Sequence, residues 1–386
     1  MKLISINLYE YTKPLKFSFQ SAHLFRTQSE SVLVRLEFDN GVVGYGESAP
    51  RFYVTGETIS TVIQTVQEHF APLLLGEDID SLEDVERLLQ VLENACQHRG
   101  VHHYLSSLGC FDIALLDALG KLHQIPLRRL IGPDIGRKVP LSIAIPFLPT
   151  KKIEALLPKI QHLKFQYIKA LVGNDLVANE ERISLIRSIF GEGMDLRIDA
   201  NGKWDFGEAV KNLKKLKTYQ ISAVEQPLSK ADIQGLKRLR NETRIPIIAD
   251  ESICSLSDAE SLLENKSCDM FNIKISKCGG ILRSKCIVDF AMSHNVPCQL
   301  GSHVGETQIL TVAANHFLTT VGNLWCFEGL SFILFQGLEE MRQVQIKTNH
   351  LNTGSFRSGW GLGISPEYFL EKCDISPLKL YFSSNM

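Results

Sequence analysis

The sequence lacks the features expected of a nucleic-acid-binding, secreted or membrane-spanning protein. Its net charge is −2 and no basic stripe runs along it, which argues against a phosphate backbone as partner. No apolar run reaches transmembrane length, and Met1-Lys2-Leu3 leads into a strand-like pattern without the apolar core of a signal peptide. We therefore expect a cytoplasmic protein that binds neither nucleic acid nor membrane.

Paired cysteines are also missing. The nine cysteines are scattered and include no C-x-x-C motif, and only Cys96 and Cys110 precede residue 250. This usage is typical of reduced thiols that serve as small core residues. Apolar residues make up 44% and charged residues 22% of the 386 residues, so we expect a globular enzyme with two domains.

Residues 1–135 have the pattern of an α+β domain. Two strand-like runs meet at Asn40-Gly41, which is a strong hairpin signal. Apolar residues at helical spacing follow in three segments, at 57–74, 82–97 and 103–122. Glycines and a proline near residue 135 mark a boundary, and we expect the irregular tail from about 351 to 386 to complete this domain.

Residues 136–350 alternate between strand and helix patterns. The eight strand candidates are LSIAIPF, YIKALVG, LRIDA, SAVEQP, IPIIADE, MFNIKIS, VPCQLGS and LWCFEG. Helix-length segments between them favour an α/β fold with a parallel barrel. An open doubly wound sheet is the alternative, but no G-x-G-x-x-G follows any strand.

Three acids and a lysine recur at the ends of successive strands. Asp199, Glu225, Asp250 and Lys274 are separated by 26, 25 and 24 residues, one strand-helix unit each. Successive strand ends lie side by side on the C-terminal face of a barrel, so these groups should converge. A single acid after a strand is usually a helix cap, but three in register with the repeat are not explained in that way.

Converging carboxylates require a cation, because like charges raise one another's pKa. A set of oxygen ligands without His or Cys suits a hard ion, Mg²⁺ before Ca²⁺ or Mn²⁺. A lysine charge on a barrel strand has to be compensated, and Lys274 beside a carboxylate–metal cluster is a candidate base or electrostatic clamp.

The motifs RIDANGKW, VEQP, IADES and NIKISKCGG resemble the metal and lysine signatures of the enolase superfamily, more narrowly of the mandelate racemase/muconate lactonizing enzyme family. GVVGYGESAP, ALLDALGK and GLGI also match, so the resemblance covers nearly the whole chain. It implies a modified (β/α)₇β barrel under an α+β capping domain formed by both chain ends. It also implies Mg²⁺ held by Asp199, Glu225 and Asp250, and removal of the proton α to a carboxylate through a metal-bound enediolate.

The second barrel strand departs from the family pattern. In the muconate-lactonizing branch this strand ends in K-x-K, followed by a hydrophobic residue and glycine. Here IKALVG places Lys169 at the first lysine, where it would support the carboxylate or the metal ligands, and Leu171 at the second. Leucine cannot move a proton, so racemisation by two opposed bases loses a partner while Lys274 is retained.

The sequence contains further candidate site residues besides these acids and lysines. His303 lies where the mandelate-racemase branch carries a catalytic histidine, but the usual aspartate partner is replaced by Lys274, so a polar rim residue is the alternative. Glu306 and Glu328 are further substrate-binding candidates. The segments 17–30 and 49–58 would form the specificity loops. Arg26 and Arg51 in them would meet a second anionic group or, alternatively, contribute surface charge only.

The resemblance implies an isomerase that acts on a small carboxylate, by isomerisation, cycloisomerisation or racemisation/epimerisation. We also expect a homo-oligomer. One alternative is an o-succinylbenzoate-synthase-like lyase or dehydratase, against which Leu171 counts. The other is a non-catalytic protein that keeps the metal and binds carboxylates.

Overall fold

The computed structural model describes residues 1–20, 25–136, 138–162, 165, 167–322, 324–329, 350–352, 359–366, 370 and 378–381. The expected specificity loop at 17–30 is therefore described only in part. Most of the expected C-terminal tail at 351–386 also lies outside the described residues, as does the end of the expected barrel domain at 330–349.

The N-terminal part contains an antiparallel sheet in the order β14-β1-β2-β3. Its strands are β1 (Leu3–Gln20), β2 (Phe25–Phe38), β3 (Val43–Ser48) and β14 (Leu378–Tyr381). The predicted hairpin is confirmed: β2 pairs with β3 across a loop in which Gly41 adopts a φ of 81°, a left-handed conformation that favours glycine. β14 pairs with β1, so the two ends of the chain share this sheet.

Helices cover one face of this sheet. The helical elements of this part are α1 (Phe52–Thr55), α2 (Ile59–Thr65), the π-helical turn η1 (Val66–Phe70), α3 (Ala71–Leu74), α4 (Leu82–His98), α5 (Leu105–Leu122) and α6 (Arg128–Ile131), of which α2 and α5 contact the strands. The central α5 packs directly on β3, because Gly44 and Gly46 have no side chains in the way. A Cβ at Gly46 would lie 1.9 Å from the carbonyl oxygen of Cys110. The three predicted helical segments are therefore helical.

The second part is a parallel eight-stranded barrel, as predicted. Its strands are β5 (Ser142–Ile145), β6 (Tyr167–Leu171), β7 (Asp195–Asp199), β8 (Ala223–Glu225), β9 (Ile247–Ala249), β10 (Met270–Ile273), β11 (Cys298–Gly301) and β12 (Leu324–Glu328), in sequential order. An isolated parallel bridge between Leu141 and Phe327 joins the two edges of the sheet. Asp250 and Lys274 each come one residue after their strands, whereas the predicted strand segments IPIIADE and MFNIKIS included them.

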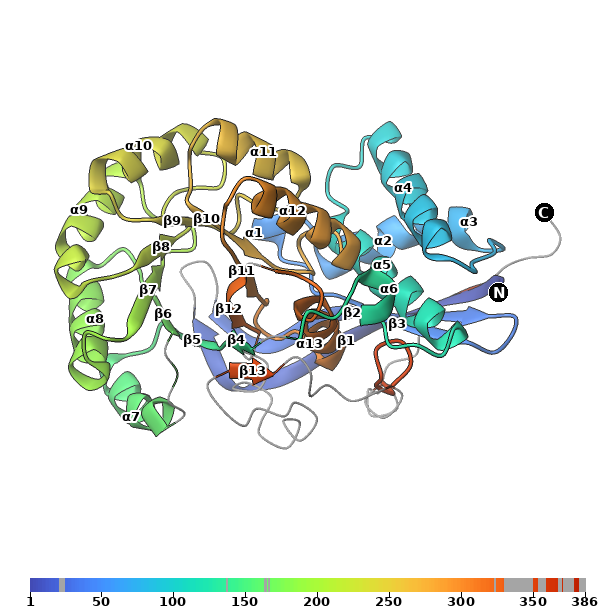
Figure 1. Ribbon diagram of the computed structural model, residues 1–386, viewed down its shortest axis with the longest axis horizontal. Helices are drawn as coiled ribbons and strands as arrows, with labels where there is room; N and C mark the ends of the chain where they lie inside the picture. The colour runs from blue at the N-terminus through green and yellow to red at the C-terminus, as the bar shows by residue number, and fades with distance from the viewer. Residues whose placement is uncertain are drawn as a thin grey trace.

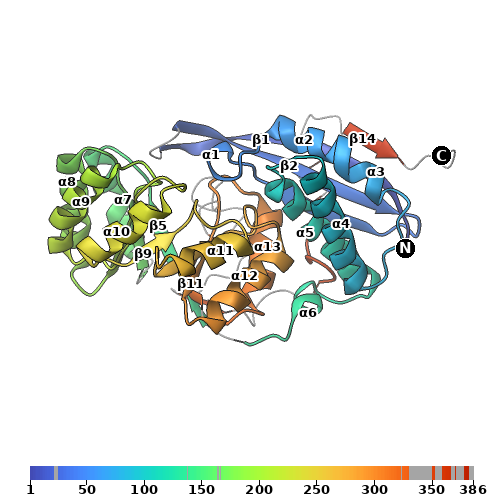
Figure 2. The same cartoon turned by 90° about the horizontal axis from the view of Figure 1, so that it is seen from above.

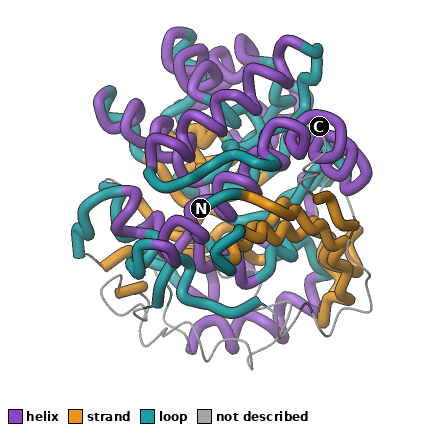
Figure 3. The backbone as a smooth tube through the Cα atoms, turned by 90° about the vertical axis from the view of Figure 1, so that its right-hand side faces the viewer, coloured by secondary structure: helices purple, strands orange, loops and turns teal. Residues whose placement is uncertain are grey.

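Seven helices connect the strands and form the outer layer of the barrel (Figure 1). They are α7 (Thr150–His162), α8 (Leu176–Phe190), α9 (Phe206–Leu216) with the 3₁₀ turn η2 (Lys217–Tyr219), α10 (Ile233–Thr243), α11 (Leu256–Glu264), α12 (Ile281–Ser293) and α13 (Gln308–Leu318). A small antiparallel pair, β4 (Lys138–Pro140) with β13 (His350–Asn352), lies beside the barrel. Figure 3 views the molecule from the side that carries the N-terminus, with helices and strands distinguished by colour. Within the described residues, no helix combines the length and apolar character needed to cross a membrane.

The helix α5 of the N-terminal part lies beside the barrel helices α12 and α13 (Figure 2), and buried acids of the N-terminal part join it to the barrel. Asp112 on α5 accepts hydrogen bonds from the backbone N–H groups of Ile281 and Leu282, at the start of α12. Glu47 on β3 accepts from Thr307 and from the Leu310 N–H at the start of α13. Carboxylates suit the first turn of a helix, because its free N–H groups carry partial positive charge. These contacts fix the N-terminal part over the carboxyl ends of the barrel strands.

Candidate active site

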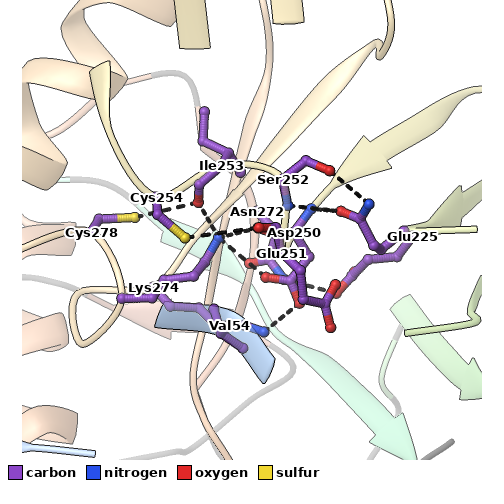
Figure 4. Close-up of polar contacts among 12 residues, drawn as sticks. Val54, Glu225, Asp250, Glu251, Ser252, Ile253, Cys254, Asn272, Lys274 and Cys278 are labelled. Atoms are coloured by element: carbon purple, nitrogen blue, oxygen red, sulfur yellow. Dashed lines mark hydrogen bonds and ion pairs between the residues drawn. The ribbon is translucent and has the colours of Figure 1, made fainter. Parts of the chain in front are cut away.

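Three buried carboxylates meet at the mouth of the barrel. Asp199 ends β7 and pairs in register with Glu225, which ends β8, while Asp250 follows β9 directly. All three are at most 3% exposed. The structure therefore brings together the three acids that the sequence spacing selected, and Figure 4 shows Glu225 and Asp250 among their neighbours.

The pKa values of these acids report their crowding. Burial raises the pKa of Glu225 to about 7, and the negative charge of Asp199 adds to the effect. Burial and repulsion from Asp250 likewise raise the pKa of Asp199. Asp250 behaves differently: burial raises its pKa, but the ammonium groups of Lys274 and Lys277 outweigh burial and hold the pKa below its ordinary value. The cluster as a whole is short of positive charge.

Two lysines lie against the carboxylates from opposite sides of the barrel. The Lys169 Nζ atom is 2.8 Å from Glu225 Oε1, 3.2 Å from Asp199 Oδ2 and 2.6 Å from Glu328 Oε1. The Lys274 Nζ atom is 2.5 Å from Asp250 Oδ2 (Figure 4). Burial lowers the pKa of each lysine, but the neighbouring carboxylates outweigh it and raise both values.

The residues suit a hard divalent cation. The donors are carboxylate oxygens, and the adjacent Glu251 carries a buried Oε2 atom that has no partner among the described residues. Burial raises the pKa of Glu251 to about 8, and Asp250 adds repulsion. Within the described residues, no three His, Cys, Asp or Glu side chains already surround one point as ligands. The two lysine ammonium groups lie against the carboxylates, so an ion here requires them to move back.

Polar side chains beneath the carboxylates were not predicted from the sequence. Asn272 Nδ2 and Gln299 Nε2 each donate to Glu225, at 2.8 Å, and so fix both of its oxygens. Arg197 donates to Gln299 and to Ser142, and its guanidinium lies 4.8 Å from the Trp325 ring centroid. A signal was available for two of them: Arg197 and Asn272 each stand two residues before a predicted site residue, Asp199 and Lys274, on the same face of the strand.

Glu328 is held by two cations. Its Oε1 atom pairs with Lys169 and its Oε2 atom lies 3.5 Å from Arg197. Burial raises the pKa of Glu328, but the two cations outweigh it and lower the pKa overall. The structure thus places Glu328 at the site, as part of the network beneath it.

An apolar cluster faces Lys274 across the barrel. Leu171, 3% exposed, packs against Leu15 of β1, Ala144 of β5, and Phe147 and Val304 of the loops after β5 and β11. The strands β6 and β10 are four places apart in the ring of eight, so Leu171 and Lys274 lie on opposite sides of the mouth. We call these five residues the Leu171 wall.

Two buried arginines hold the wall in place. Arg182 stacks on Phe147, with its guanidinium carbon 4.1 Å from the ring centroid, and donates to the carbonyl of Leu171 at 3.3 Å. Arg51 donates to the carbonyl of Val304 at 2.7 Å, and also to the carbonyls of Pro50 and Glu30. Arg51 therefore links the N-terminal part to the barrel loop that contacts Leu171.

The remaining predicted residues surround this mouth. Arg26 pairs with Glu30 at 3.3 Å. His303 and Glu306 lie together on the loop after β11, where Glu306 accepts from the Ser276 hydroxyl and from the backbone N–H of His303. Burial raises the pKa of Glu306 to about 7. Residues from the N-terminal part and from several strand ends of the barrel thus enclose one buried, highly charged site.

A closed parallel barrel, an N-terminal capping sheet and three acids at consecutive strand ends define the class of protein. Residues 4–132 match the sequence profile "Mandelate racemase / muconate lactonizing enzyme, N-terminal domain", and residues 153–368 match "Enolase C-terminal domain-like". The chain belongs to the mandelate racemase/muconate lactonizing enzyme family of the enolase superfamily.

Individual relatives are similar over most of their length. The L-Ala-D/L-Glu epimerase of Bacillus subtilis is 32% identical over 333 residues, 85% of this chain and 88% of the relative. The N-succinyl-L-Arg/Lys racemase of Bacillus cereus is 27% identical over 321 residues, 82% and 84% of the two chains. The crystal structure of the dipeptide epimerase of Enterococcus faecalis with Mg and the dipeptide L-Leu-L-Tyr superposes with a TM-score of 0.82. It is 28% identical and covers 95% of this chain and 100% of its own.

Proposed function

We propose that the protein is a Mg²⁺-dependent enzyme that removes the proton α to the carboxylate of a small substrate, with Lys274 as the base. The observation that carries this proposal is the placement of Lys274 against Asp250, beside two further carboxylates at consecutive strand ends. This arrangement combines a site for a divalent ion with a buried amine within reach of it.

Asp199, Glu225 and Asp250 would hold the ion. Bound there, Mg²⁺ supplies positive charge that stabilises the second negative charge developing on the substrate carboxylate. The chain supplies the rest of the chemistry. Lys169 adds a fixed cation above Glu225, and the Asn272 and Gln299 amides keep Glu225 in place.

A lysine base has to be unprotonated, and the Asp250 contact opposes this. Once Asp250 is engaged elsewhere, Lys274 loses its strongest ion-pair partner. Burial and the nearby positive charge of Lys169 then favour the neutral amine. Its Nζ atom can accept the substrate's α-proton and return it to the same face.

The Leu171 wall determines the stereochemical outcome. A substrate held between β6 and β10 presents one face to Lys274 and the other to apolar side chains that cannot transfer a proton. We therefore propose proton exchange at one face, in contrast to the two-sided exchange that racemisation by opposed bases requires. A lyase shares this partial reaction, since elimination needs no proton on the second face.

The substrate class follows from the relatives. Dipeptides and N-succinylated amino acids share a free carboxylate, an α-proton and an acylated α-nitrogen. We propose an N-acylated α-amino acid as substrate. A second anionic group on it would meet Arg26, whose guanidinium is half-buried and paired only with Glu30 in the ion pairs of the described residues.

A screen for deuterium incorporation tests the proposal without knowledge of the product. Dipeptides and N-succinyl amino acids of both configurations are incubated in D₂O with the enzyme and Mg²⁺, and Cα deuteration is followed by mass spectrometry and NMR. We expect Mg²⁺-dependent exchange that EDTA abolishes. Ligand binding without any exchange would contradict the enzymatic proposal and support a carboxylate-binding protein.

A further inference from the structure

The imidazole of His303 is fixed by groups from three segments. It lies on the loop after β11 and is 4% exposed. Its Nδ1 atom is 3.2 Å from the carbonyl oxygen of Ala49 and 3.1 Å from the hydroxyl oxygen of Ser276. A carbonyl oxygen can only accept a hydrogen bond, so Nδ1 carries the proton in this contact.

Ser276 strengthens this assignment. Its hydroxyl donates to Glu306 Oε1 at 3.0 Å, which commits its single hydrogen and leaves its oxygen free to accept from His303. Glu306 also accepts from the backbone N–H of His303 at 2.6 Å, so this acid holds the His303 backbone directly and contacts its ring through Ser276. The neutral ring therefore has its lone pair on Nε2.

This Nε2 atom is buried and has no hydrogen-bond partner among the described residues. An acceptor left in that state has lost the hydrogen bond to water that it would make if exposed, and this loss is unfavourable. Protonation does not relieve it, because burial, together with the cations Lys274 and Arg51, lowers the pKa of His303 well below its ordinary value. The ring is therefore a neutral acceptor in a site whose other buried side chains are mainly ionic.

The position of His303 in the barrel indicates which part of a bound ligand can reach its Nε2 atom. β11 is the neighbour of β10, and a Cβ built on Gly301 would lie 3.1 Å from Lys274 Cε, so the Lys274 side chain passes over the end of β11. His303 follows two residues later and lies on the Lys274 side of the mouth.

We propose that His303 Nε2 is a recognition group that accepts a hydrogen bond from an N–H donor on the substrate, the N–H of an acylated α-nitrogen. This inference rests on the proposed function, since it assumes a substrate bound at the barrel mouth. It assigns His303 to substrate selection: N-acylamino acids satisfy the buried acceptor, and esters of α-hydroxy acids of the same shape leave it unpaired.

Two substitutions separate the two ring nitrogens. His303→Asn keeps an amide donor near the position of Nδ1, for Ala49 and Ser276, and removes Nε2. His303→Gln places an amide near Nε2, whose oxygen can accept. His316→Gln is the matched control. His316 is another buried histidine, on α13, and its Nε2 atom donates to the carbonyl of Leu362 in the C-terminal segment.

The probes are N-succinyl-L-leucine and its oxygen analogue, the succinyl ester of L-2-hydroxy-4-methylpentanoic acid, which lacks the N–H. Calorimetry on the Mg²⁺-loaded enzyme gives the ratio of their dissociation constants. We expect the wild-type preference for the amide to fall about 3- to 10-fold in His303→Asn, the range expected for one neutral hydrogen bond. His303→Gln should keep part of the wild-type preference for the amide, and His316→Gln should keep all of it.

The outcomes separate this inference from the proposed function. An unchanged ratio in His303→Asn, with exchange intact, overturns the role of His303. A shifted pH profile of exchange with an unchanged ratio overturns it too, because Nε2 would then serve Lys274. A changed ratio without deuterium exchange supports His303 as a recognition group and contradicts the proposed catalysis. Binding of neither probe contradicts both.

Discussion

Gly301 is the position at which one added methyl group should disturb the site most selectively. A Cβ there would lie 2.5 Å from Asn272 Oδ1 and 3.1 Å from Lys274 Cε. Because nonbonded heavy atoms seldom approach within about 3 Å, the Asn272 amide has to move by at least about 0.5 Å. That amide donates to Glu225 Oε1 at 2.8 Å, so the displacement reaches a proposed metal ligand.

The expected magnitude follows from this displacement. Overpacking a buried position costs about 1–3 kcal/mol of stability, and misplacing catalytic groups by about 1 Å reduces rates by about 100-fold. We expect Gly301→Ala to lower the rate of deuterium exchange by about 10- to 100-fold and to weaken Mg²⁺ binding, while the protein stays folded at 25 °C.

The assay compares exchange rates, Mg²⁺ affinity by calorimetry and thermal unfolding for wild type and variant. Gly193→Ala is the matched control, since a Cβ at this exposed glycine meets nothing within 4 Å. Wild-type exchange and Mg²⁺ affinity in Gly301→Ala would refute the reasoning, because they would show that neither Asn272 nor Lys274 needs its observed position.

Three further predictions concern the metal, the stereochemistry and pH. Asp199→Ala and Asp250→Ala should each weaken Mg²⁺ binding at least 10-fold by calorimetry; affinities equal to wild type would remove these residues from the metal site. Deuterium should enter only one enantiomer of an exchanging substrate, with retention, because Leu171 is no acid or base; rapid interconversion of both enantiomers would reveal a second base. Burial raises the pKa of Asp112 to about 7, above its value in the unfolded chain, so the folded state binds more protons at intermediate pH. The free energy of unfolding should therefore fall as pH rises from about 4 to about 7 and level off above, and Asp112→Asn should flatten this slope in urea titrations; equal slopes would place the titration elsewhere.

The sequence was sufficient for the framework of the site. Strand-helix repeats of nearly constant length place Asp199, Glu225 and Asp250 at neighbouring strand ends, because a parallel barrel aligns those ends. The hairpin at Gly41 and the helices 82–98 and 105–122 were predictable from local signals for the same reason: turn chemistry and helical periodicity act over a few residues.

The remaining features of the site depend on contacts between segments that are distant in the sequence. Leu171 was visible as a departure from the family pattern, but its packing against Leu15 and Val304 joins residues far apart in the chain. The tautomer of His303 depends on Ala49, which local sequence does not place near it. The domain boundary at residues 135 and 136 stays a prediction.

Deuterium exchange by Lys274→Ala tests the central claim most directly. Exchange at Cα of a substrate from the screen is measured for wild type, for Lys274→Ala and for Lys211→Ala, which removes an exposed lysine of α9. Mg²⁺ affinity is measured on the same samples, to show that the metal site survives. We predict that Lys274→Ala loses exchange at least 1,000-fold, a large share of the general-base contribution of about 100- to 10,000-fold, while Lys211→Ala exchanges like wild type. Exchange at the wild-type rate in Lys274→Ala would contradict the account and assign the base to another group.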